Sequence, residues 1–150
     1  MPAPIIHSPD RLKIVIPHIQ LLIKSTQFNE LRATVESMGI SEDLELVYAL
    51  LLDISSGQVS NILHTICAHL VAIIEIITRR ICDLEMRLSN HREQYFWYWR
   101  RPFTEDLVAQ LHHDQYILHV RTQRLLALFS NSKPIMGEYR RASLRMADAR

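Results

Sequence analysis

Residues 63–88 read LHTICAHLVAIIEIITRRICDLEMRL, and this stretch decides the fold. Its apolar side chains recur at alternating steps of four and three residues, at Leu63, Cys67, Leu70, Ile74, Ile77, Ile81, Leu84 and Leu88. Such steps place side chains on one face of an α-helix. No glycine or proline occurs between Gly57 and Pro102. The pattern therefore predicts one long central helix over about residues 58–90, reaching residue 100 at most.

The apolar face of this helix changes width along its length. Before Thr78 further apolar residues flank the seam, at Ile62, Ile66, Val71, Ile73 and Ile76. After Thr78 the flanking positions are charged, at Arg80, Asp83, Glu85 and Arg87. A wide apolar arc is typical of a helix inside a bundle, and a narrow one of a contact with a single helix. We expect the first half to be core and residues 78–90 to project and pair with one neighbour, which could belong to a second copy of the chain.

Two helices are expected before Gly39. Ser8-Pro9-Asp10 is a helix-start signal, because it combines a capping hydroxyl, a proline at the first helical position and an acid near the positive end of the dipole. Pro17 should kink or divide the helix that follows. A short helix over about 28–38 should then end at Gly39 in a left-handed conformation.

Three further signals complete the helical pattern. Ser41 with two following acids should cap a third helix that is apolar on nearly every side and is stopped by Ser55-Ser56-Gly57, which places it in the middle of the bundle. Thr104 should cap a fifth helix that reaches about Phe129. Its core face is expected at Leu107, Val108, Leu111, Leu118, Leu125 and Phe129, with interruptions at Gln115 and Thr122.

Composition supports a single all-α domain. The chain has 150 residues and only three glycines, which hairpin turns and bulges of sheets would require. We predict a helical bundle of about five helices over residues 1–132, followed by a flexible basic tail at 133–150. The overall charge is +1, so no global attraction to nucleic acid or membrane is indicated.

The sequence lacks the signatures of enzymes and of metal or cofactor sites. No glycine-rich phosphate loop, serine-nucleophile motif or zinc-ligand spacing occurs. Eight histidines are present, but His112 and His119 are separated by about 10 Å along a helix, too far to share an ion without closer ligands. We therefore predict a non-enzymatic chain with no catalytic residues, no metal and no cofactor.

Two adjoining regions are the predicted interaction surfaces. The seam over 78–91 would contribute Ile77, Ile81, Leu84 and Leu88, and the aromatic-basic patch over 92–103 would contribute Tyr95, Trp97, Tyr98 and Trp99. Consecutive aromatic residues fan out around a helix, so some must be exposed or lie at an interface, unless they wedge the turn between two long helices. The prediction is an adaptor that forms a homo-oligomer, with a dimer favoured, or binds another protein. Small, glycine-poor and motif-free chains of this kind are common among viral and phage accessory proteins.

The alternative is a self-assembling coat or nucleoprotein-like subunit. Aromatic rings beside arginines can stack on bases, and the tail carries a net charge of +3. The candidate nucleic-acid contacts are Arg92, Arg100, Arg101, Arg140, Arg141 and Arg145. Arg140-Arg141-Ala142-Ser143 also matches the pattern that basophilic kinases prefer, so Ser143 is a candidate phosphorylation site. Nucleic acid is the less favoured partner.

The remaining expectations concern the compartment. Cys67 and Cys82 lie about 22 Å apart on the long helix and cannot form a disulfide with each other. No signal-peptide pattern is visible at the N-terminus. The apolar run from Leu70 to Ile77 contains Glu75 and is short for a membrane span. We expect an intracellular, reducing, cytoplasmic location without membrane contact.

Overall fold

A computed structural model describes residues 8–54, 60–93 and 104–132, and these residues are almost entirely helical. The helices are α1 (Ser8–Ser25), α2 (Asn29–Ser37), α3 (Ile40–Leu52), α4 (Asn61–Glu93) and α5 (Glu105–Ser132). Within these ranges there is no strand, which confirms the predicted all-α class and the long central helix. The candidate tail, residues 133–150, lies outside the described residues.

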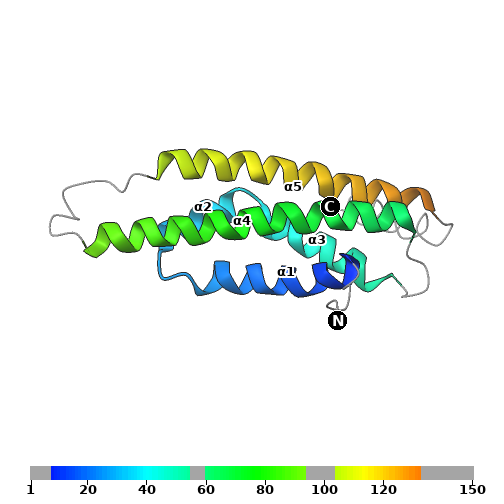
Figure 1. Cartoon of the computed structure of the whole chain (residues 1–150), viewed down its shortest axis with the longest axis horizontal. Helices are drawn as coiled ribbons and strands as arrows, with labels where there is room; N and C mark the ends of the chain where they lie inside the picture. Colours follow the sequence, from blue (N-terminus) through cyan, green and yellow to red (C-terminus); the bar gives the residue numbers. More distant parts are fainter. Residues whose placement is uncertain (1–7, 55–59, 94–103, 133–150) are drawn as a thin grey trace, which may run out of the picture.

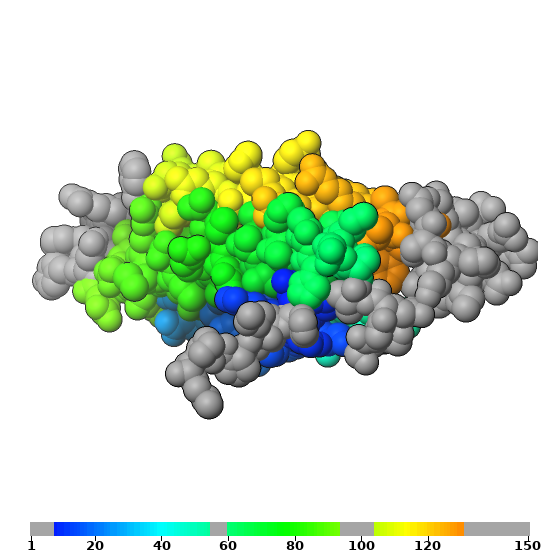
Figure 2. Space-filling view, turned by 45° about the vertical axis from the view of Figure 1, so that its right-hand side comes forward, coloured from blue at the N-terminus to red at the C-terminus, as the bar shows by residue number. Residues whose placement is uncertain are grey.

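The helices form a bundle with four legs, in which α2 and α3 together make one leg (Figure 1). Successive legs run in opposite directions along the long axis of the molecule. α4 packs against α1 and α5, and α3 packs against α1, α2 and α5. The bundle thus consists of two antiparallel hairpins, α1 with α2–α3 and α4 with α5, laid face to face. One face of the molecule is formed by α5, α4 and α1 (Figure 2).

Pro17 does not divide the first helix, contrary to one of the two expected outcomes. α1 begins at Ser8, as the Ser-Pro-Asp signal predicts, and continues to Ser25. Its core face consists of Leu12, Ile16, Ile19 and Ile23. Pro17 points to the exposed side of the helix. Since proline cannot donate to the carbonyl of Lys13, this position leaves that carbonyl where water can reach it.

Gly39 joins α2 to α3. It has φ +76°, the left-handed conformation predicted for the end of α2. Its N–H donates to the Glu36 carbonyl, and its own carbonyl accepts from the N–H of Asp43. The same glycine therefore begins α3 at Ile40, and the prediction that Ser41 caps this helix is wrong.

α3 occupies one leg of the bundle and is not its centre. Ile40, Leu44, Val47 and Leu51 are buried, whereas Leu52 is 62% exposed. The expectation of a helix surrounded on every side is therefore wrong. The excess of leucine follows from the contacts that α3 makes with three different helices, which require apolar side chains over a wide arc.

α4 is core along both of its halves. It begins at Asn61, passes through Asn90 without a break and ends at Glu93. Seven of the eight predicted seam residues are buried, from Leu63 to Leu84, and Leu88 is partly buried against the same core. The expectation that residues 78–90 project from the bundle is wrong for Ile81 and Leu84, which are buried, whereas the last turns of α4 extend beyond the ends of α1 and α5 (Figure 1).

α5 has the predicted core face with two polar positions inside it. Leu107, Leu111, Leu118, Leu125 and Phe129 are buried, and Val108 is partly buried. The buried polar residues on this face are Asp114 and Thr122, of which only Thr122 was expected.

By length and composition alone, α4 could cross a bilayer, and it is the one helix of the described residues for which this holds. The sequence expectation considered only the run from Leu70 to Ile77, which contains Glu75, and overlooked the wider apolar stretch around it. Of the most apolar stretch of α4, 39% is buried inside the bundle. The core helix of a helical bundle has the same length and composition, and the buried seam of α4 is of that kind.

Candidate functional site

The predicted seam residues lie inside the bundle. Ile77, Ile81 and Leu84 are 0%, 1% and 1% exposed, respectively. A second chain could reach these side chains only if the bundle opened. Their part in an interface stays a prediction, and in the folded chain they supply the apolar contacts between α4 and its neighbours.

Two of the charged residues that flank the seam, Arg80 and Arg87, bind α5. Arg80 donates to the carboxylate of Asp114 through Nε. A terminal nitrogen of the same guanidinium donates to Oε1 of Gln110 at 2.5 Å. Two turns further along α4, Arg87 donates to Asp106 at 2.8 Å. The narrow apolar arc after Thr78 thus results from ion pairs with α5 and not from a lack of neighbours.

The Arg87–Asp106 pair is exposed, and it lies where α4 ends and α5 begins. The hydrogen bond from Arg87 holds the pKa of the Asp106 carboxyl below its ordinary value, assisted by the positive charge of the guanidinium. The pair joins the two helices beside the segment that connects them. Its contribution to stability is small, as is usual for solvent-exposed ion pairs.

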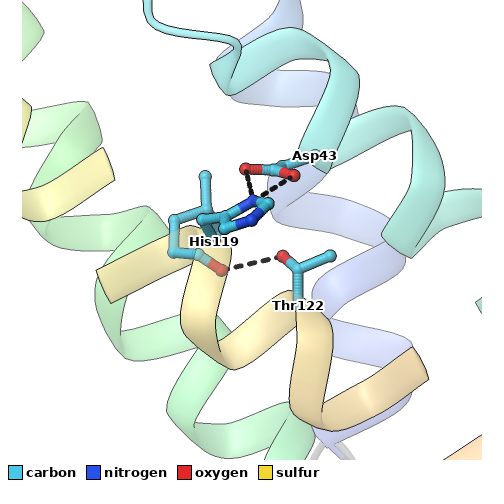
Figure 3. Close-up of polar contacts among 4 residues, drawn as sticks. Asp43, His119 and Thr122 are labelled. Carbon is cyan, nitrogen blue, oxygen red and sulfur yellow. Dashed lines mark hydrogen bonds and ion pairs between the residues drawn. The ribbon is translucent and has the colours of Figure 1, made fainter. Parts of the chain in front are cut away.

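A second buried carboxylate, that of Asp43, faces His119 across the contact between α3 and α5 (Figure 3). Nδ1 of His119 lies 3.2 and 3.3 Å from the two carboxylate oxygens of Asp43. The Asp43 side chain is 11% exposed and the His119 side chain 52%. Asp43 also lies in the first turn of α3, where the helix dipole stabilises a negative charge.

The Asp43–His119 pair joins α3 to α5. A carboxylate beside a histidine fixes the orientation of the ring. Among the described residues, Asp43 is the side chain that contacts the polar atoms of His119. Thr122, one turn along α5, is fully buried and donates to the Leu118 carbonyl at 2.8 Å (Figure 3).

Neither cysteine is activated for chemistry. Cys67 is buried, and burial raises the pKa of its thiol to about 12. Cys82 is exposed, and desolvation together with the negative charges of Glu85 and Asp83 raises the pKa of its thiol. A raised pKa keeps the thiol protonated at neutral pH and therefore weakly nucleophilic. Both cysteines are free, and both lie on α4 as predicted.

No group of three or more His, Cys, Asp or Glu side chains within residues 8–54, 60–93 and 104–132 could hold a metal ion. His112, His113 and His119 all lie on exposed positions of α5.

Most of the predicted contact residues cannot be placed. Tyr95, Trp97, Tyr98 and Trp99 lie outside the described residues, as do the arginines at 100, 101, 140, 141 and 145 and the candidate phosphorylation site Ser143. Arg92 is described, and it is exposed in the last turn of α4. Sequence reasoning missed Asp43, Arg80 and Asp114 as paired residues, since nothing local in the sequence indicates which helices become neighbours.

Large apolar side chains on the surface are the other features with binding potential. Six of them are at least 60% exposed within the described residues: Ile14, Leu21, Leu52, Ile62, Met86 and Tyr116. Isolated exposed apolar side chains are ordinary, whereas several on one stripe indicate a contact surface. Ile14 and Leu21 share a stripe of α1.

A scan against protein-family models finds no match for this chain, and neither a search of curated proteins nor a search of solved structures finds a similar one.

Proposed function

We propose that this protein is a non-enzymatic helical interaction module that binds a protein partner through the aromatic-basic patch, residues 92–103. The observation that carries the proposal is the place of this patch along the chain. It connects α4 to α5, and the two helices are held together beside it by the Arg87–Asp106 pair and by the burial of Leu84 and Leu107. Partner contacts are commonly concentrated in aromatic and arginine side chains of this kind.

The polar chemistry of the described residues supports a binding role. The buried carboxylates of Asp43 and Asp114 each form a hydrogen bond with a side chain of another helix. These groups are used to hold the bundle together and are not directed into a shared cleft. The seam of α4 is likewise occupied by the bundle itself, so the proposal retains only the patch at the end of that helix. The two free cysteines agree with an intracellular, reducing location, which forms part of the proposal.

Charge favours a protein partner over nucleic acid. The described residues contain ten Lys and Arg against fourteen Asp and Glu, so the helical part of the chain is acidic. A phosphate backbone would be repelled by such a surface and would be attracted only by the basic segments outside it. Nucleic acid is therefore retained as an outcome of the test.

The test compares three forms of the full-length chain as bait in an extract of the source cells. The patch variant carries alanine at Tyr95, Trp97, Tyr98 and Trp99. The matched control carries glutamine at Arg140, Arg141 and Arg145. We expect a protein captured by the wild type and by the control, but not by the patch variant, and direct binding of that purified protein in calorimetry.

Two results would contradict the proposal. Capture that is unchanged in the patch variant would remove the patch from the interface. Salt-sensitive binding of a fluorescent single-stranded oligonucleotide, lost in the arginine-to-glutamine control, would instead support the nucleoprotein alternative.

A further inference from the structure

The outer face of α1 carries an apolar stripe with a charge at each end. Ile14 and Leu21 are 60% and 65% exposed, and Pro17 lies exposed between them. Asp10 precedes the stripe and Lys24 follows it, and both are exposed. At about 100° per residue these five side chains fall within an arc of about 80°, so they form one continuous strip along the helix.

The charges of this strip are not used within the described part of the chain. The printed ion pairs of that part involve neither Asp10 nor Lys24, whereas their neighbour Arg11 is paired with Glu75 of α4 at 2.5 Å. The helix dipole accounts for an acid near the start of α1 and a base near its end. It does not account for two large apolar side chains that point to solvent between them.

The strip is complementary to itself when reversed. Asp10 and Lys24 are centred on residue 17, and Ile14 and Leu21 are centred between residues 17 and 18. If a second α1 is laid antiparallel across the first, Ile14 faces the partner's Leu21 and Asp10 faces the partner's Lys24. Twofold symmetry makes each contact twice, as in an isologous dimer interface.

We propose that this strip, defined by Asp10, Ile14, Pro17, Leu21 and Lys24, is a homodimer interface that receives the same strip of a second copy in antiparallel orientation. It is independent of the aromatic-basic patch, which belongs to the connection between α4 and α5. A pair of single helical faces buries less area than a standard interface, so we expect a dissociation constant of about 10–100 µM.

The decisive experiment uses charge reversal in the full-length protein, with the dissociation constant measured by sedimentation equilibrium at low salt. Asp10→Lys places two lysines opposite each other at both ends of the interface, and Lys24→Asp does the same with two aspartates. Each single variant should weaken the homodimer at least tenfold. An equimolar mixture of the two should form a heterodimer, because every lysine then faces an aspartate. The double variant should also dimerise, with the pairs reversed.

Apolar variants test the centre of the strip. Leu21→Lys should weaken dimerisation at least tenfold, whereas Tyr116→Lys, at an equally exposed position of α5, should leave it unchanged. Circular dichroism melting of each variant shows whether the fold is retained, and the mixing experiment remains informative where a single charge change lowers the melting temperature. A wild-type chain that stays monomeric at hundreds of micromolar would overturn the proposal. The strip would then be covered by another protein or by another segment of the chain. Failure of the mixed singles to associate would overturn the antiparallel register.

Discussion

Asp114 occupies a position on the core face of α5 that the helical spacing would give to an apolar residue, between Leu111 and Leu118. Its side chain is 5% exposed, so the loss of hydration must be offset by partners. Arg80 supplies the hydrogen bond to Asp114 through Nε, and its terminal nitrogen donates to Oε1 of Gln110. Such a pair adds less to stability than its charge suggests, but removing one partner leaves the other poorly satisfied.

The first expected outcome concerns this pair. Asp114→Ala should lower the free energy of unfolding by about 1–3 kcal/mol, because Arg80 loses its acceptor at a site with limited access to water. The double change Arg80→Met with Asp114→Leu should recover most of that loss, since neither polar group remains. Urea denaturation measures both values. An unchanged stability in Asp114→Ala would show that the pair does not join α4 to α5.

Asp106 gives an expected pH dependence. Its pKa is lowered in the folded chain by the hydrogen bond from Arg87, so the pair stabilises the fold above the ordinary carboxyl pKa near 4. The stabilisation is lost as the pH falls through the lowered pKa, because protonated Asp106 no longer attracts Arg87. In an NMR titration, Arg87→Gln should raise the pKa of Asp106. An unchanged titration curve in that variant would contradict the assignment of Arg87 as the cause.

At the scale of the element, the helices followed from the sequence because their signals are local. The spacing from Leu63 to Leu88, the Ser-Pro-Asp start of α1 and Gly39 each depend on residues within one or two turns. The sequence does not predict which helices pack against one another. The narrow apolar arc after Thr78 predicts a contact with a single neighbour, whereas the charged residues beside it, Arg80 and Arg87, bind carboxylates 34 and 19 residues later in the chain. The local spacing of residues does not indicate which distant residues form such pairs.

A substitution at Gly39 tests how the connection between α2 and α3 contributes to stability. An alanine there would adopt φ near +76° and place its Cβ 3.1 Å from Oε2 of Glu42. The glutamate side chain is flexible and can move, so the cost is mainly that of the backbone conformation, about 1–2 kcal/mol. Gly39→Asn should cost less, because asparagine tolerates this conformation better. Equal stabilities of the alanine variant and the wild type in urea denaturation would contradict the role of Gly39.

Ile81 tests whether the second half of α4 is internal. Ile81→Lys should abolish cooperative folding, because the site is 1% exposed and offers no partner for a charge. Ala72→Lys, at an exposed position on the same helix, should change the stability by less than about 0.5 kcal/mol. Circular dichroism and thermal melting separate these outcomes. A helical but dissociated Ile81→Lys chain would instead show that the seam is an interface between copies.

At the scale of the whole molecule, charge is divided between the bundle and the remaining segments. The described helices carry an excess of four acidic residues, although the whole chain has a charge of +1. The aromatic-basic patch and the tail therefore hold the compensating positive charge. The acidic excess is greatest on α2 and α3, where Glu30, Glu36, Glu42 and Glu45 are exposed. If the proposed patch binds a partner, the basic residues of its sequence favour an acidic protein.

The central claim is that the seam of α4, from Leu63 to Leu84, is core within a single chain. Hydrogen exchange of the α4 amides at submicromolar and at high protein concentration tests this claim most directly. We expect residues 73–77 and 81–84 to be equally protected at both concentrations, because α1 and α5 of the same chain cover them. Rapid exchange of 81–84 in the dilute protein, with protection only at high concentration, would contradict the claim and show that a second chain completes the seam.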